Sequence, residues 1–168
     1  FDSAGRKWFA TANGVSVLND NGTPFNRADD QWMSFGTADV YGVAIDGAGR
    51  KWLGTGNGVS ALNDNGTPFN KSDDQWISFA RADGMSSRFV EAIAIDGAGR
   101  KWIGTNGGGL NRLDDGGTPF TKTDDIWVTY TVGSGLISNN IWDIAIDGAG
   151  RKWIGALQGI SVLDDAGT

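Results

Sequence analysis

The chain has 168 residues, a net charge of −6, and neither Cys nor His. This composition excludes a disulfide framework, a thiolate metal site and a cysteine nucleophile, and it removes the commonest general base and transition-metal ligand. The acidic balance argues against nucleic acid as a partner, and no apolar run approaches the roughly 20 residues of a membrane span. The 27 glycines are typical of many tight turns.

The chain opens inside a repeated phrase. FDSAGRKW ends at Trp8, and IDGAGRKW ends at Trp52, Trp102 and Trp153, so the repeat returns after 44, 50 and 51 residues. The unit is constant and its connections vary, which indicates a packed core with surface loops. Because Phe1 already lies within a repeat, we expect a fragment, a processed chain or the ordered part of a longer one.

Each unit reads as four short strands in chain order. The first strand is β-branched and alternating, the second contains RKW, the third resembles VSALND, and the fourth follows the phrase GTPF and contains DDxW. Asp/Gly and Asn/Gly pairs between them supply the turns. A helical interpretation fails because the segments are short, glycine-rich and β-branched. The predicted first strands are 40–46, 89–96 and 141–147.

Four antiparallel strands repeated at this spacing predict a β-propeller. We predict one all-β propeller segment over residues 1–168, built of four-stranded antiparallel blades, with about 3.5 blades and 14 strands. The first unit lacks its inner strand and the last lacks its outer strand, so both ends present edges. We therefore expect a homo-oligomer, most simply two chains giving about seven or eight blade positions, or a longer chain. The predicted blade repeats are 1–40, 41–90, 91–140 and 141–168, the first and last incomplete.

The recurring tryptophan of the RKW phrase is the predicted structural framework. An isolated blade would leave both faces of its sheet in water, whereas blades in series cover each other's faces. We expect these side chains to pack between blades, at Trp8, Trp52, Trp102 and Trp153.

Two stretches carry a family resemblance. GLISNNIWDIAIDGAGRKWIG at 135–155 and WIGTNGGGLNRLDD at 102–115 resemble the two-component regulator propeller repeat. The resemblance implies a sensory propeller, periplasmic or extracellular, whose relatives often sense saccharides ahead of a signalling module. The chain departs from the family pattern in having Arg-Lys before every repeated Trp and in having VSVL and VSAL in its first two units. Streptogramin lyase-like propellers have a similar strand pattern, but that resemblance implies a His-dependent lyase.

Motifs that could carry chemistry have simpler structural explanations. The Asp-rich turns could hold calcium, but turn formation explains them, since Asp and Asn bond to their own backbone. The Arg-Lys pairs could form a ring of cations for an anionic glycan, or could pair with nearby Asp, as Arg50 with Asp46. GTNGGG at 104–109 fits a turn between strands. We predict no catalytic residue, no metal and no cofactor.

The positions that break the repetition are the predicted binding site. Tyr41, Glu91 and Trp142 are equivalent residues near the start of the inner strands, where loops would surround one opening of the propeller. Aromatic rings could cover the apolar face of a sugar and polar groups could bind its hydroxyls, although drift in exposed loops is the alternative. The full set of candidates is Tyr41, Glu91, Trp142, Asp143, Arg88 and Asn140.

The sequence thus predicts a non-enzymatic binding or sensory module. Its partner would be a small molecule or glycan, or a protein, bound by the loop-rich face. A structural, self-assembling repeat unit is the alternative, and a glycan-active or lyase enzyme is the least favoured. We expect no nucleic acid partner and no membrane span.

Overall fold

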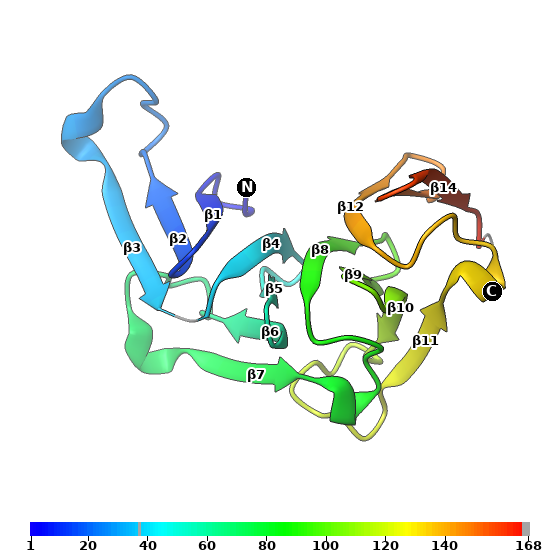
Figure 1. Cartoon of the computed structure of the whole chain (residues 1–168). Helices are drawn as coiled ribbons and strands as arrows, with labels where there is room; N and C mark the ends of the chain where they lie inside the picture. Colours follow the sequence, from blue (N-terminus) through cyan, green and yellow to red (C-terminus); the bar gives the residue numbers. More distant parts are fainter. Residues whose placement is uncertain (37, 166–168) are drawn as a thin grey trace.

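The computed structural model describes residues 1–36 and 38–165, and it contains four antiparallel sheets (Figure 1). Blade 1 contains β1–β3, blade 2 contains β4–β7, blade 3 contains β8–β11 and blade 4 contains β12–β14. The predicted all-β propeller segment with 14 strands in sheets of three, four, four and three is confirmed. The strands are β1 (Lys7–Thr11), β2 (Gly14–Asn19), β3 (Gln31–Gly36), β4 (Val40–Ile45), β5 (Lys51–Thr55), β6 (Gly58–Asn63), β7 (Gln75–Phe79), β8 (Val90–Ile95), β9 (Lys101–Thr105), β10 (Gly109–Asp114), β11 (Ile126–Tyr130), β12 (Ile141–Ile146), β13 (Lys152–Ala156) and β14 (Gly159–Leu163).

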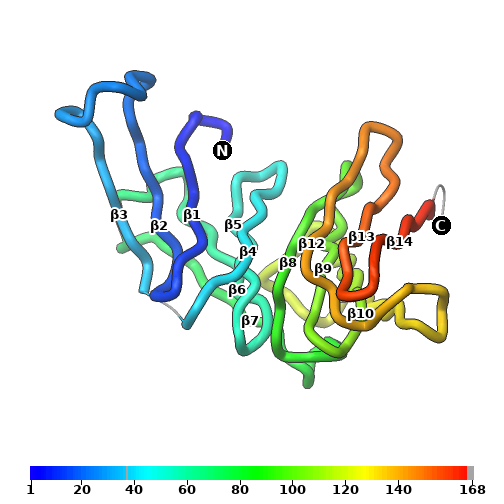
Figure 2. Tube along the Cα trace, turned by 45° about the horizontal axis from the view of Figure 1, so that its top comes forward, coloured from blue at the N-terminus to red at the C-terminus, as the bar shows by residue number. Residues whose placement is uncertain are grey.

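The blades follow one another in an open arc. The outer strands β3, β7 and β11 run along the rim in Figure 1, whereas β4, β8 and β12 lie next to one another on the inner side. Figure 2 shows the same succession of sheets from a second direction. The DDxW phrase forms the outermost strand and the alternating β-branched segment forms the innermost one, as the repeat predicts.

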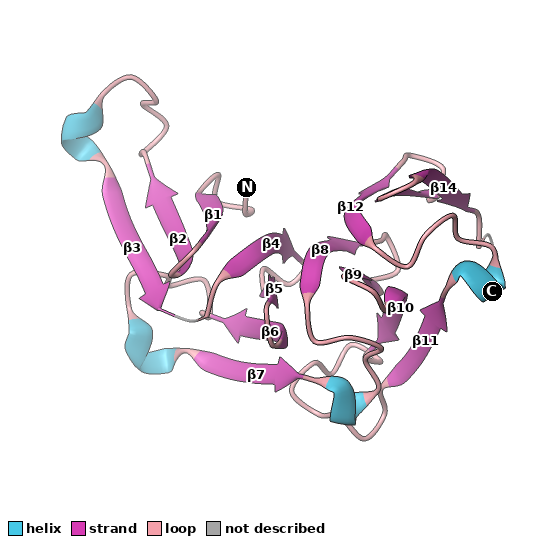
Figure 3. Cartoon of the chain, in the orientation of Figure 1, coloured by secondary structure: helices cyan, strands magenta, loops and turns pink. Residues whose placement is uncertain are grey.

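Four single-turn 3-10 helices interrupt the strands, and the repeat did not predict them. Figure 3 shows each of them, in cyan, next to one end of an outer strand. None of the helices in the described part of the chain has the length or apolar character needed to cross a membrane. The four 3-10 helices of the described residues are η1 (Arg27–Asp29), η2 (Lys71–Asp73), η3 (Arg81–Asp83) and η4 (Val132–Ser134).

Glycine is required at the first residue of β6 and of β10, where the backbone lies against the end of the outer strand of the same blade. Gly58 has a φ of +111° and Gly109 a φ of +83°, a region that disfavours side chains. A Cβ atom on Gly58 would lie 2.1 Å from the carbonyl oxygen of Phe79, and one on Gly109 would lie 2.2 Å from that of Tyr130. The GTNGGG stretch is therefore a turn between β9 and β10, as expected.

The first three repeated tryptophans pack toward the next blade. Trp52 stacks on Phe79 of its own outer strand, with ring centroids 5.5 Å apart, and joins a buried cluster with Ile93 and Ile103 of blade 3. Trp8 and Trp102 occupy the same position toward blades 2 and 4. Trp52 and Trp102 are completely buried at these contacts between blades.

The fourth tryptophan does not follow this pattern. Trp153 is 42% exposed, whereas we expected it to be packed between blades. Its face would meet a following blade, and the described residues contain no sheet beyond β14. Ile160 and Val162 on the same sheet are exposed as well.

An aspartate, an arginine and the tryptophan form a clamp in every unit, called here the Asp–Arg–Trp clamp. In blade 2, Asp46 accepts hydrogen bonds from Arg50 Nε at 2.6 Å and from Trp52 Nε1 at 3.1 Å. The backbone N–H groups of Ala48 and Arg50 also donate to Asp46, which closes the hairpin. The expected pairing of Arg50 with Asp46 is confirmed, and the clamp explains the fixed spacing of the repeated phrase.

The lysine beside that arginine is buried instead of exposed. Lys51 Nζ lies 2.7 Å from both carboxylate oxygens of Asp64 and 4.4 Å from the ring centre of Trp8 in the preceding blade. Lys101 and Lys152 repeat the arrangement over Trp52 and Trp102. Since these lysines lie between blades, they cannot form a cation ring for an anionic glycan, and that interpretation is wrong.

The clamp makes the fold sensitive to acid. Burial of Asp46 disfavours its charge, but the hydrogen bonds from Trp52 and Arg50 outweigh this effect and lower the pKa of Asp46. The pKa values of Asp2 and Asp96 are lowered in the same way. A lowered folded-state pKa gives stability that is present above the unfolded pKa of about 3.9 and is lost as the pH falls below it.

We therefore expect the melting temperature to fall steeply below about pH 4 at constant ionic strength. Asp74 and Asp125, whose pKa values are raised mainly by burial, act in the opposite direction. An Asp46→Asn variant isolates the clamp, because it should be less stable at neutral pH and should show a shallower fall in acid. Identical pH profiles for the variant and the wild type would contradict this account.

Candidate functional site

A β-bulge lies at each of the three equivalent positions that the sequence singled out. In blade 2 the register passes from Val40 opposite Thr55 to Gly42 opposite Gly54, which leaves Tyr41 unmatched. The same shift leaves Glu91 unmatched in β8 and Trp142 unmatched in β12. A bulge re-aims the extra side chain out of the regular alternation of the strand, and bulges are common beside binding sites.

The side chains at the bulges are accessible. Tyr41 is 50% exposed and Trp142 is 55% exposed. Because β4, β8 and β12 are neighbours, the three bulges form a row across the inner side of the arc (Figure 1). The two aromatic residues therefore lie on the strands on either side of the strand that carries Glu91.

The surroundings add groups that the sequence analysis did not name. The rings of Tyr41 and Phe89 both border Gly56, and the Arg88 guanidinium lies 4.4 Å from the ring centre of Phe89. Asn106 Nδ2 lies 3.4 Å from Glu91 Oε1. The repeat pattern predicts Phe89 only as the start of a strand, but in the structure it is 43% exposed and immediately precedes the inner strand β8 in the loop-rich region.

The remaining predicted residues are less closely associated with the row. The Asn140 carbonyl accepts a hydrogen bond from Leu157 N at 3.0 Å, and Asp143 accepts one from the backbone of Ile144. Within residues 1–36 and 38–165, no hydrogen bond or ion pair joins the six predicted residues to one another. The row is thus an open surface in which each polar group keeps its own local partner.

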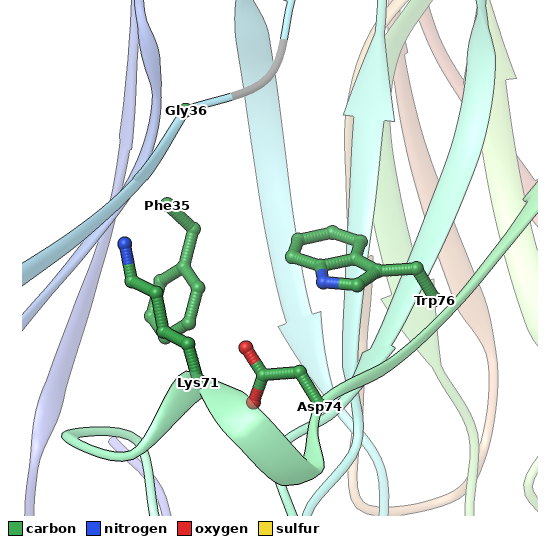
Figure 4. A pocket seen from close by; sticks show the side chains of 5 residues that line it. All are labelled: Phe35, Gly36, Lys71, Asp74 and Trp76. Atoms are coloured by element: carbon green, nitrogen blue, oxygen red, sulfur yellow. The ribbon is translucent and has the colours of Figure 1, made fainter.

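A second site, which the sequence analysis missed, lies between the outer strands of blades 1 and 2. A pocket of about 440 Å³ opens there, called here the open pocket; Figure 4 shows Lys71 beside Phe35, with Trp76 across the space and Asp74 below. Lys71 Nζ lies 2.6 Å from the Ser34 carbonyl oxygen and 5.0 Å from the ring centre of Phe35. Burial, then the nearby carboxylates, raise the pKa of Asp74. The open pocket is lined by Phe35, Gly36, Lys71, Asp74 and Trp76.

The aspartate-rich segments serve turns in the structure. Asp64 accepts a hydrogen bond from the backbone of Gly66 in addition to its pairing with Lys51, and Asp73 accepts one from the Thr67 hydroxyl at 2.9 Å. In the described part of the chain, no group of three or more carboxylates could hold a metal ion.

Comparisons with known proteins establish the fold. No protein-family model matches the chain, and no curated protein matches it. Among solved structures, it resembles the extracellular domain of the hybrid two-component system protein BT3049 from B. thetaiotaomicron, with a TM-score of 0.74 and 24% identity over 99% of this chain and 21% of that one. It also resembles PorZ, a surface component of the type IX secretion system of Porphyromonas gingivalis, with a TM-score of 0.73 and 24% identity over 96% of this chain and 24% of that one.

The fold that the structure and these comparisons define is the β-propeller. The neighbours include the extracellular domains of BT3049 and BT4673, which are two-component regulator propellers of the type that the repeat motif resembles. The chain spans about a quarter of the length of these neighbours. Virginiamycin B lyase from Staphylococcus aureus is a more distant neighbour, with a TM-score of 0.65 and 15% identity over all of this chain and 52% of that one.

Proposed function

We propose that the chain is a non-enzymatic recognition module of a periplasmic or extracellular sensor, and that it binds a saccharide across the inner strands. The observation that carries this proposal is the row of bulges that presents Tyr41, Glu91 and Trp142 on adjacent strands. The likeness to extracellular sensor domains supports the setting.

The chemistry of the row suits a sugar. The exposed rings of Tyr41 and Trp142 can cover the apolar C–H faces of a pyranose, and the Glu91 carboxylate can accept hydrogen bonds from hydroxyl groups. Arg88 and Asn140 lie on the flanking loops, where they can bind further hydroxyls. A longer saccharide could extend along the row, since the three bulges lie on successive inner strands.

Composition argues against an enzyme. A form of the lyase from S. aureus in which a histidine is replaced by alanine is described as catalytically inactive. The present chain has no histidine. The row also offers no nucleophile with an adjacent base, so recognition without turnover is the function its side chains support.

Binding to a glycan array tests the proposal. We expect the wild-type chain to retain a defined set of saccharides, and a Tyr41→Ala/Trp142→Ala variant to lose them while keeping its melting temperature. Trp32→Ala is the matched control, because Trp32 is 58% exposed but lies on an outer strand. Retention of the same glycans by the double variant would contradict the proposed site.

Self-assembly is the second candidate function, and the buried lysines favour it. Each of the three blade interfaces places a lysine over the tryptophan of the preceding blade, at 4.4 to 4.6 Å. Trp153 has no such lysine over it in the described chain, and within the same residues Lys7, which pairs with Asp20, lies over no tryptophan, its ring contact being Phe1 at 5.6 Å. A second copy could place its Lys7 over Trp153 and its exposed Phe9 against blade 4.

Light scattering after gel filtration distinguishes this candidate. Assembly predicts a mass that is a multiple of 17.7 kDa. It also predicts that Trp153→Glu yields the monomer while Trp142→Ala leaves the mass unchanged. A wild-type chain that runs as a monomer over a wide concentration range would rule out assembly.

A further inference from the structure

The open pocket has a closed counterpart one blade further on. Between blades 2 and 3, the connection from β7 to β8 folds over the outer strand of blade 3. There the Asp83 carboxylate accepts a hydrogen bond from Lys122 Nζ at 2.9 Å. The backbone of Gly84 lies against Trp127, since a Cβ atom on Gly84 would be 2.7 Å from Trp127 Cγ.

The open pocket keeps every other part of this arrangement. Lys71 and Lys122 each donate to a carbonyl of the preceding blade, at 2.6 and 2.5 Å. Each ammonium group lies 5.0 Å from the ring centre of a buried phenylalanine. Asp74 and Asp125 are equivalent, and burial raises the pKa of both carboxyl groups.

The connection that leads from the outer strand to the next blade is shorter at the open pocket. Phe35 and Val40 are separated by six residues fewer than Phe79 and Val90. Asp39 occupies the sequence position of Asp83, but it directly precedes β4 and is exposed. Lys71 accordingly has no carboxylate within ion-pair distance in the described part of the chain.

The exposed ring and the Lys71 ammonium, for which no ion pair is found among the described residues, line the same pocket. Trp76 is 41% exposed, whereas Trp127 is partly buried beneath the loop. Figure 4 shows the Lys71 ammonium and the Trp76 ring on opposite sides of the space. A volume of about 440 Å³ is sufficient for a short stretch of peptide.

We propose that the open pocket binds an acidic turn of a partner protein, with an Asp-Gly pair that takes the place of Asp83 and Gly84. The partner's carboxylate pairs with Lys71, and its glycine backbone lies flat on Trp76, because a side chain there would clash as it would at Gly84. In the closed counterpart, Asp83 pairs with Lys122 although Asp125 stands at the position equivalent to Asp74, so Asp74 is compatible with an incoming carboxylate.

The chain's own loop provides the probe. A fluorescein-labelled hexapeptide with the sequence of residues 81–86, Arg-Ala-Asp-Gly-Met-Ser, should bind saturably in an anisotropy titration. A peptide with Asn in place of Asp should bind at least about tenfold more weakly, because it lacks the charge-assisted hydrogen bond. Lys71→Met should cause a similar loss, whereas Lys122→Met, at the closed counterpart, should leave binding unchanged.

A loop insertion gives a second, independent test. Inserting Gly-Met-Ser-Ser-Arg-Phe between Asp39 and Val40 restores the length of the longer connection, and it should close the pocket and abolish peptide binding. Equal affinity for the Asp and Asn peptides, binding that survives Lys71→Met, or absence of binding would each overturn the proposal. Displacement of the peptide by acetate at equal concentration would overturn it too, because a carboxylate alone would then suffice.

Discussion

Replacement of Trp102 by alanine will lower the free energy of unfolding by about 3–5 kcal/mol. The indole is fully buried, stacks on Tyr130 at 5.8 Å, and packs against Ile144 and Ile154 of blade 4. Its removal leaves a cavity between two rigid sheets that cannot close around it, and it also removes the indole donor from Asp96.

Trp153→Ala provides the control for this substitution. Trp153 has the same local sequence and the same clamp, but nearly half of its side chain already contacts water, so we expect a loss below about 2 kcal/mol. Denaturant melts of both variants measure the difference directly. Similar losses at the two positions would show that contact between blades contributes little to stability.

Lys101→Met will also destabilise the chain strongly, by about 3–5 kcal/mol. Lys101 and Asp115 are both almost completely buried, with Nζ 2.5 Å from the carboxylate. The methionine can fill the space over Trp52, but it leaves the aspartate charge without a partner in a site that excludes water.

Two further variants separate charge from packing. Lys7→Met breaks the equivalent pair with Asp20 where the lysine is 26% exposed, so it should cost only about 1 kcal/mol. A Lys101→Met/Asp115→Leu double variant removes both charges and should recover most of the lost stability. A double variant as unstable as Lys101→Met would mean that packing, not the unpaired charge, accounts for the loss.

Most of the fold could be predicted from the repeat. Each unit contains its own alternation of apolar and polar residues, its own turn residues and its own tryptophan, and a pattern that returns four times is not due to chance. The order of the strands and their division into blades could therefore be predicted from local signals. The pairing of Arg50 with Asp46 was also predictable, because both residues belong to one hairpin.

Relations between units were harder to predict. The pairing of Lys51 with Asp64 joins two strands, and its position over Trp8 depends on how blades stack. Lysine is usually exposed, so the sequence left a solvent-facing cation ring open beside pairing with nearby Asp, and it did not predict burial between blades. The exposure of Trp153 likewise depends on what lies next to blade 4, which its own sequence does not encode.

In both candidate sites, the sequence showed which positions differ between units, but it did not show what those differences do in the structure. Tyr41, Glu91 and Trp142 are candidates because they break the repetition, whereas the bulges at these positions are visible only in the strand register. The short connection after Phe35 was equally visible in the sequence. That this short connection leaves Lys71 and Trp76 uncovered became clear only by comparison with the closed counterpart in the next blade.

The indole N–H resonances of the eight tryptophans offer the most direct test of the binding face. A 15N-labelled chain is titrated with the glycan that the array retains best. The account predicts that the Trp142 resonance shifts with saturation, while the buried Trp52 and Trp102 resonances stay in place. Shifts confined to the outer-strand residues Trp32, Trp76 and Trp127 would contradict it, because the saccharide would then bind at the rim.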